Sequence, residues 1–115
     1  MTSSLLNQAL LVLTNVPEQE LAQSLARTLV EGKLAACVNI LAPMASIYRW
    51  QGQVEHAIEI PLLIKTTQAR YQEVEQAILQ AHPYDVPEIV ALPLAAGLPA
   101  YLAWMQEETR KPLRV

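Results

Sequence analysis

Phenylalanine is absent from this 115-residue chain, glycine occurs only three times and cysteine only once. The shortage of glycine leaves no glycine-rich phosphate loop, so a nucleotide site of the Walker or Rossmann type is not expected. A lone cysteine, Cys37, excludes an intrachain disulfide framework and fits a reducing compartment. No apolar run is long enough to span a bilayer, and no signal-like stretch is evident. These absences predict a cytoplasmic protein with no membrane partner.

Basic residues are also few. The eight lysine and arginine residues are scattered along a chain whose net charge is −3, so no basic stripe exists that would neutralise phosphates. Nucleic acid is therefore not an expected partner. The serines lack histidine and acid partners in a nucleophile motif, and solvation explains the carboxylates Glu55, Glu59, Asp85 and Glu88 as well as acid–base chemistry does. The sequence predicts no enzyme.

Hydrophobic residues, in contrast, make up 52% of the chain. This share is above that of a typical globular domain and exceeds what one small core needs. The length predicts a single domain over residues 1–115, with an ordered core at about residues 5–108. Because small domains gain burial by associating, the apolar surplus predicts contacts between copies of the chain.

Periodicity in the first third of the chain predicts a strand and then a helix. Residues 5–14 form a nearly continuous apolar run, which is typical of a strand buried on both faces. Residues 17–31 carry apolar side chains at helical spacing. Asn15 is a candidate N-cap for this helix, and Gly32 stands where a left-handed C-cap would lie.

A long hairpin is predicted next. Residues 34–50 read as extended chain, Gln51 and Gly52 supply a tight turn, and residues 54–65 alternate between two faces. This hairpin exceeds the usual strand length of about five or six residues. We therefore expect it to project beyond its own sheet.

The last third of the chain predicts a helix, a strand and a second, short helix. Thr66 and Thr67 can cap the first of these helices, which Pro83 ends. Residues 89–94 form the final strand, and we expect the charged tail from Thr109 to fray.

The complete order predicts an α+β fold. It is a ferredoxin-like β-α-β-β-α-β sandwich with a long β-hairpin and a short C-terminal helix. Two helices would cover one face of an antiparallel sheet. The opposite face would stay bare and apolar unless a partner buries it.

Five short motifs resemble those of one known family. They are AACVNI at 35–40, SIYRWQG at 46–52, IKT at 64–66, HPYDVPEI at 82–89 and YLAWM at 101–105. In order and spacing they are similar to CutA, the divalent-ion tolerance proteins, over about residues 9–107. The resemblance implies a ferredoxin-like homotrimer related in architecture to the PII signalling proteins. It also implies a link to tolerance of copper and other divalent metals.

Cys37 and His82 are the candidate metal ligands. A thiolate suits Cu(I), and an imidazole can coordinate a cuprous or divalent ion. Each residue also has a simpler interpretation, because a cysteine in a strand is often a small core residue and a histidine at a helix C-terminus is stabilising. Some members of the family carry cysteine at the position of Thr14 and a second histidine at that of Ala81, both proposed to bind copper. We therefore predict weak metal binding and no obligatory cofactor.

A second group of residues combines aromatic rings and charges near two turns. Its members are Tyr48, Arg49, Trp50, Lys65, Tyr84, Asp85 and Glu88. Arg49 and Lys65 could hold a small anion between the rings, in a cleft between subunits. The same residue types are also enriched at protein interfaces, and an interface is the favoured interpretation. In the ferredoxin-like order, we expect Lys65 to lie near the loop that carries Tyr84.

The sequence thus predicts a trimeric cytoplasmic protein that binds or scaffolds, associated with divalent-metal tolerance. The alternative is a PII-like sensor of a small anion, and a third interpretation is a purely structural trimer. The expected partners are further copies of the chain and a metal ion or small anion, with neither nucleic acid nor a membrane among them.

Overall fold

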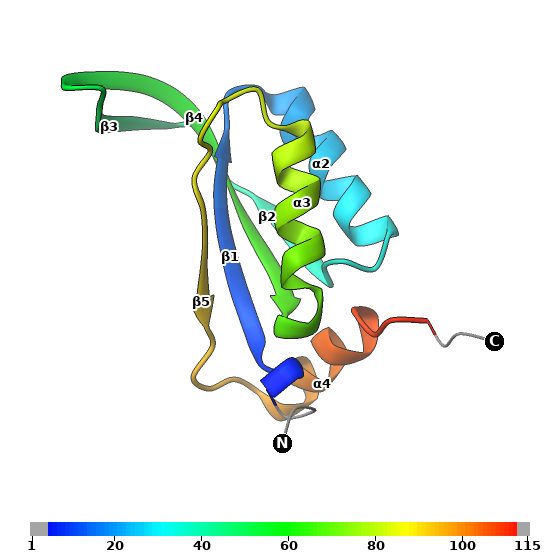
Figure 1. Ribbon diagram of the computed structural model, residues 1–115. Helices are drawn as coiled ribbons and strands as arrows, with labels where there is room; N and C mark the ends of the chain where they lie inside the picture. The colour runs from blue at the N-terminus through cyan, green and yellow to red at the C-terminus, as the bar shows by residue number, and fades with distance from the viewer. Residues whose placement is uncertain (1–4, 113–115) are drawn as a thin grey trace.

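The computed structural model describes residues 5–112, and it confirms the predicted α+β fold. The elements follow one another as β1 (Ala9–Val16), α2 (Gln19–Glu31), β2 (Cys37–Ile40), β3 (Met44–Trp50), β4 (Gln53–Thr67), α3 (Tyr71–Ala81), β5 (Ile89–Pro93) and α4 (Pro99–Glu108). A short 3-10 turn, Gln68–Arg70, joins β4 to α3. The antiparallel sheet has the order β2-β4-β1-β5, and β3 pairs only with the outer half of β4. Helices α2 and α3 cover one face of the sheet, and the β3–β4 hairpin projects from it (Figure 1).

The core lies between the sheet and the two long helices. Val12, Leu62 and Ile64 face it from the sheet, and Leu29 and Ile78 face it from the helices, all with no exposed surface. Spacings of two residues in a strand and of three or four in a helix bring these side chains to one layer. Apolar periodicity in the sequence therefore located the core correctly.

The first strand differs from its predicted form. It runs from Ala9 to Val16 rather than over 5–14, and Leu5 lies in a helical turn. The prediction that both faces are buried is wrong for the single chain, since buried and half-buried residues alternate along β1. Helices α2 and α3 shield one face of the sheet (Figure 1), whereas on the other face α4 contacts only one end, at Lys65 and Thr67.

The other face forms an uncovered apolar surface, as predicted. Leu11 pairs with Leu92 across β1 and β5, and Leu13 pairs with Val90. Residues directly opposite in adjacent strands share a face, so these four side chains form one patch. Val90 and Leu92 remain 47% and 51% exposed. We call this patch the open sheet face.

The ends of α2 also differ from prediction. Its N-cap is Glu18, not Asn15, and no side chain caps it. Gly32 has an ordinary φ of −82°, while Lys33 takes the left-handed conformation with φ 60°. The amide of Leu34 then donates to the carbonyl of Leu29 at 2.9 Å, which closes the helix.

The prediction that the tail frays from Thr109 onward is wrong at Thr109 itself, which is packed. Thr109 is 2% exposed, and its hydroxyl lies 2.8 Å from the carbonyl oxygen of Met105. Met105 has no exposed surface. The end of α4 is therefore part of the folded domain. The capping expected of Thr67 is also absent, because no side chain caps the 3-10 turn and β4 continues through Thr67.

The hairpin turn has the geometry predicted for it. Gln51 and Gly52 have φ values of 49° and 82°, as the two-residue turns that suit twisted strands require. Nothing lies within 4 Å of a Cβ built on Gly52, so conformation alone opposes a side chain there.

We expect Gly52→Ala to lower the free energy of unfolding by about 1 kcal/mol, because alanine disfavours positive φ. Gln51→Gly should be neutral or slightly stabilising, since it removes the same strain at the neighbouring position. Urea denaturation of both variants checks this. Equal losses would show that the turn conformation contributes nothing.

Candidate functional site

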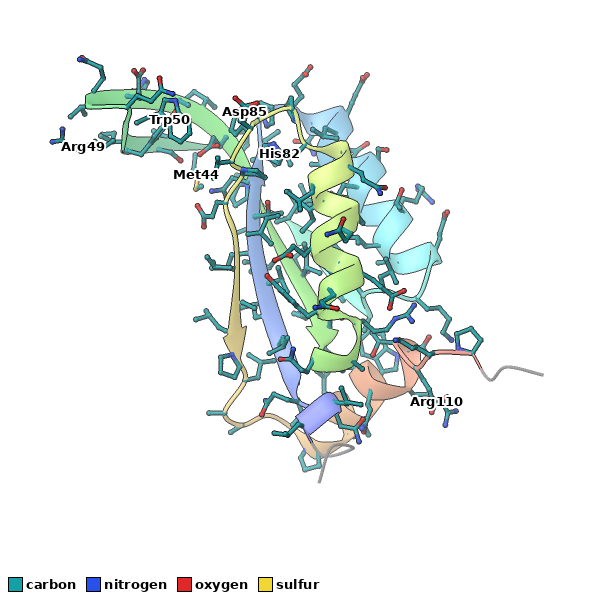
Figure 2. All side chains as sticks on the ribbon, viewed as in Figure 1. Met44, Arg49, Trp50, His82, Asp85 and Arg110 are labelled. Atoms are coloured by element: carbon teal, nitrogen blue, oxygen red, sulfur yellow. The ribbon has the colours of Figure 1, made fainter. Side chains whose placement is uncertain are left out.

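A cleft of about 950 Å³ opens where the hairpin leaves the sheet. Its walls come from β1, the hairpin, the inner part of β4 and the loop of residues 83–88. The lining residues are Leu13, Asn15, Met44, Ser46, Ile47, Tyr48, Trp50, Glu59, Pro61, Leu62, Leu63, Pro83, Tyr84, Asp85, Val86, Pro87 and Glu88. In Figure 2, Met44 and Trp50 on the hairpin and Asp85 on the loop lie at this end of the molecule, whereas Arg110 lies at the other end. A volume of this size suits a small organic ligand.

His82 holds the loop of the cleft in place. The residue is 8% exposed, and its Nε2 lies 2.6 Å from the backbone oxygen of Asn15. The backbone amide of Tyr84 donates to Nδ1 at 3.2 Å. Because Nδ1 accepts this hydrogen bond, the ring proton resides on Nε2, which donates to Asn15. The two aromatic rings of His82 and Tyr84 are 4.6 Å apart, centre to centre.

This bonding gives His82 a structural role. Both of its ring nitrogens are engaged by backbone groups, so a metal ion would have to displace one of them. Asn15 also donates from Nδ2 to Oε1 of Glu88 at 3.0 Å, which ties the far end of the loop to β1. The loop between α3 and β5 is thus fixed to β1 by both of its ends.

The structure separates the two candidate metal ligands. Cys37 pairs with Lys65 of β4, whereas Asn15, the partner of His82, pairs with Pro61. Four residues along a strand correspond to about 13 Å. The thiol of Cys37 lies 3.7 Å from Oδ1 of Asn39. Among residues 5–112, no three His, Cys, Asp or Glu side chains gather closely enough to hold a metal ion.

The aromatic and charged group predicted from sequence is divided in a similar way. Tyr48, Trp50, Tyr84, Asp85 and Glu88 all line the cleft. The two basic members of the group, Arg49 and Lys65, do not line the cleft. Strand alternation turns one of them, Arg49, to the opposite side of β3 from its two aromatic neighbours, and it lies near the outer end of the hairpin (Figure 2).

Lys65, the other basic member, lies on a different part of the sheet. Its Nζ is 3.3 Å from the hydroxyl of Tyr101 and 5.5 Å from the centre of that ring. The expectation that Lys65 approaches the loop with Tyr84 is therefore not met within one chain. Lys65 is six residues from Glu59 along β4, which corresponds to about 20 Å.

Glu59 is the cleft residue whose importance the sequence did not reveal. In the sequence, ordinary solvation explains Glu59 as well as acid–base chemistry does, yet in the fold it is only 9% exposed. Burial raises the pKa of the Tyr84 hydroxyl, and the negative charge of Glu59 raises that pKa further. The one available signal was its place between Ile58 and Ile60, in the middle of a strand of 15 residues.

The charge of the cleft is negative. Glu59, Asp85 and Glu88 contribute carboxylates, and no lysine, arginine or histidine is among its lining residues in the described part of the chain. Three aromatic rings and several aliphatic side chains supply the rest of its surface. Within one chain, these walls favour a cationic or neutral ligand over an anion.

We expect Glu59→Gln to lower the pKa of Tyr84 toward the ordinary value of 10.0, because the carboxylate that opposes ionisation is removed. At a pH near 10, more tyrosinate should then form. Ultraviolet titration of the variant against the parent measures the change, with Glu20→Gln on the exposed side of α2 as the control. Superimposable titrations of all three proteins would contradict the proximity of Glu59 and Tyr84.

No helix in residues 5–112 is both long and apolar enough to cross a membrane.

Comparison with known proteins gives consistent matches. The family model described as CutA1 divalent ion tolerance protein matches residues 10–108. A divalent-cation tolerance protein CutA from Thermus thermophilus is 50% identical over 98 residues, which are 85% of this chain and 95% of that protein. A chloroplastic CutA protein from Arabidopsis thaliana is 40% identical over 89% of this chain, and the match spans 56% of that longer protein. The solved structure of Cut A1 from Thermus thermophilus superimposes with a TM-score of 0.87 at 48% identity, covering 89% of this chain and 99% of that one.

Proposed function

The chain belongs to the CutA1 divalent ion tolerance family, and from that premise we propose that it acts as a homotrimeric binding protein in divalent-metal tolerance. In this proposal it works in the cytoplasm and catalyses no reaction. Its partners are two further copies of itself and a weakly held metal ion, with neither nucleic acid nor a membrane among them.

The open sheet face is the observation that supports the proposed homotrimer. Leu92 and Val90 are about half exposed on a strand that has a neighbour on one side only. An apolar patch next to an unpaired strand edge is unfavourable in water, and association removes both. The exposed apolar residues of the projecting hairpin, Ile47, Val54 and Ile58, support the same conclusion.

Light scattering tests the assembly. We expect the parent protein to have three times the mass of one chain at micromolar concentration. Leu92→Lys should yield a lower mass, because it places a charge in the contact. Leu79→Lys is the control, since Leu79 is 43% exposed on α3, in the helical layer. A parent protein with the mass of one chain would overturn the proposed trimer.

The role in metal tolerance needs a test in cells. A strain that lacks its own CutA protein is plated on increasing copper and supplied with the parent chain, Leu92→Lys or Leu79→Lys. We expect growth to be restored by the parent and by Leu79→Lys but not by the variant that disrupts assembly. Growth that is identical with and without the parent chain would contradict the role.

Direct metal binding is expected to be weak. Both ring nitrogens of His82 are hydrogen-bonded to backbone groups, and Cys37 lies apart from His82 on β2. Titration calorimetry of the metal-free protein with divalent copper measures this. A submicromolar dissociation constant would contradict the expectation.

The PII-like alternative, a sensor of a small anion between subunits, stays a prediction. The cleft has a suitable size, but its three carboxylates do not support an anionic ligand within one chain. A basic side chain from a neighbouring copy would be needed to reverse this charge.

A further inference from the structure

Glu59 is a buried acid without a cationic partner. About nine-tenths of the residue is removed from solvent. The ion pairs in residues 5–112 join Arg27 to Glu31, Arg70 and Lys111 to Glu73, and Arg110 to Glu107. None of these pairs includes Glu59 or the other two carboxylates of the cleft. The hydroxyl of Tyr84 is a hydrogen-bond partner of Glu59, but these ion pairs bring it no positive charge, and burial of a carboxylate without one is costly.

Aromatic rings line the cleft that holds this carboxylate, and the charge of Glu59 acts on the hydroxyl of one of them, Tyr84. Tyr48 and Trp50 on the hairpin and Tyr84 on the loop line the same cleft, each with about two-fifths of its surface exposed. Exposed ring faces next to a carboxylate attract a positive group through both the ring quadrupole and the charge. The cleft thus combines a buried anion, an aromatic wall and open space.

The kind of cation follows from the same geometry. A metal ion is disfavoured, because the three carboxylates do not converge as a ligand set in the described chain. A planar guanidinium or amidinium can instead donate two parallel hydrogen bonds to one carboxylate while its face lies on an aromatic ring. Such groups are also more weakly hydrated than ammonium, so the free-energy cost of removing them from water is smaller.

We propose that the cleft binds a planar guanidinium or amidinium group, held by the carboxylate of Glu59 and faced by Tyr84. This site does not depend on metal binding by the chain. Two sources could supply the group. One is a free small molecule, and the other is Arg49 from the hairpin of a second copy, which lies outside its own cleft.

Three probes of nearly equal shape test the charge preference. Benzamidinium is planar and cationic, benzamide is neutral and benzoate is anionic. The Trp104→Phe background leaves Trp50 as the only tryptophan of the chain, which has two, so its fluorescence reports on the cleft directly. We expect saturable binding of benzamidinium, at least tenfold weaker binding of benzamide, and none of benzoate.

Two substitutions test the role of Glu59. Glu59→Gln should weaken benzamidinium binding at least tenfold, whereas Glu20→Gln, an equal change of charge on α2, should leave it unchanged. The comparison of the three probes needs no change at Glu59, so it remains decisive if Glu59→Gln fails to fold. Similar binding of all three probes, or unchanged binding in Glu59→Gln, would overturn the proposal.

The variant Arg49→Ala distinguishes the two sources. If the parent protein binds benzamidinium and Arg49→Ala binds it equally well, the group comes from a free ligand. If binding appears or strengthens only in Arg49→Ala, a second copy supplies the group in the assembled protein. Absence of binding in both proteins would overturn the site.

Discussion

Replacement of His82 by alanine should lower the free energy of unfolding by about 3 kcal/mol. The residue is 8% exposed, and its imidazole joins the carbonyl of Asn15 to the amide of Tyr84, which are otherwise in separate segments. The variant loses both hydrogen bonds, leaves two backbone groups without these partners and opens a void next to β1. Urea denaturation at a fixed protein concentration gives the value.

An exposed residue of the helical layer provides the control. Gln23 is exposed on α2, so Gln23→Ala should change stability by no more than about 0.5 kcal/mol. Copper titration of both variants completes the comparison. If His82→Ala kept full stability but lost copper binding, His82 would be a ligand and its structural role would be wrong.

Two buried threonines should respond to the same substitution in opposite directions. Thr14 and Thr66 both have no exposed surface. The hydroxyl of Thr66 donates to the carbonyl of Leu34 at 2.6 Å, whereas that of Thr14 has no hydrogen-bond partner in the described chain. Valine has nearly the same shape as threonine and lacks the hydroxyl.

Thr14→Val should therefore raise the free energy of unfolding by about 1 kcal/mol, because it removes a polar atom that is buried without a partner. Thr66→Val should lower it by about 2 kcal/mol, since it also leaves the Leu34 carbonyl unsatisfied. Thermal and urea denaturation of the two variants measure both effects. A loss of stability in Thr14→Val would contradict the prediction that the hydroxyl of Thr14 is buried without a partner.

Thr14 also bears on metal binding. It is at the position where some family members carry cysteine, and it faces the helices rather than the cleft. A cysteine there would be equally buried, so a metal ion could not reach it without local opening of the fold. The buried position of Thr14 thus adds to the shortage of metal ligands that the sequence predicts.

The sequence by itself determined the order of the elements, the buried faces of the two long helices and the turn at Gln51 and Gly52. These features depend on local rules, namely the two periodicities and the tolerance of positive φ. The motif at 82–88 likewise located the loop of the cleft, and the motif at 46–52 located the hairpin. The family resemblance had the same origin, since it rested on contiguous motifs, and the comparisons confirm it.

Only the tertiary structure decided which charges and hydrogen-bonding groups meet. His82 contacts Asn15 across 67 positions of sequence, Lys65 lies beside Tyr101, and Glu59 is buried although its neighbours in sequence suggest a half-exposed strand. These outcomes depend on strand register, and on how far the hairpin extends past the sheet. The inner half of β4 is buried in the sheet and its outer half is exposed in the hairpin. Because side chains alternate with the same period in both halves, the sequence pattern does not show where burial begins. The sign of the cleft's charge follows from this placement: β4 and the loop of residues 83–88 bring three carboxylates to the cleft, strand alternation turns Arg49 away from it, and Lys65 lies farther along β4.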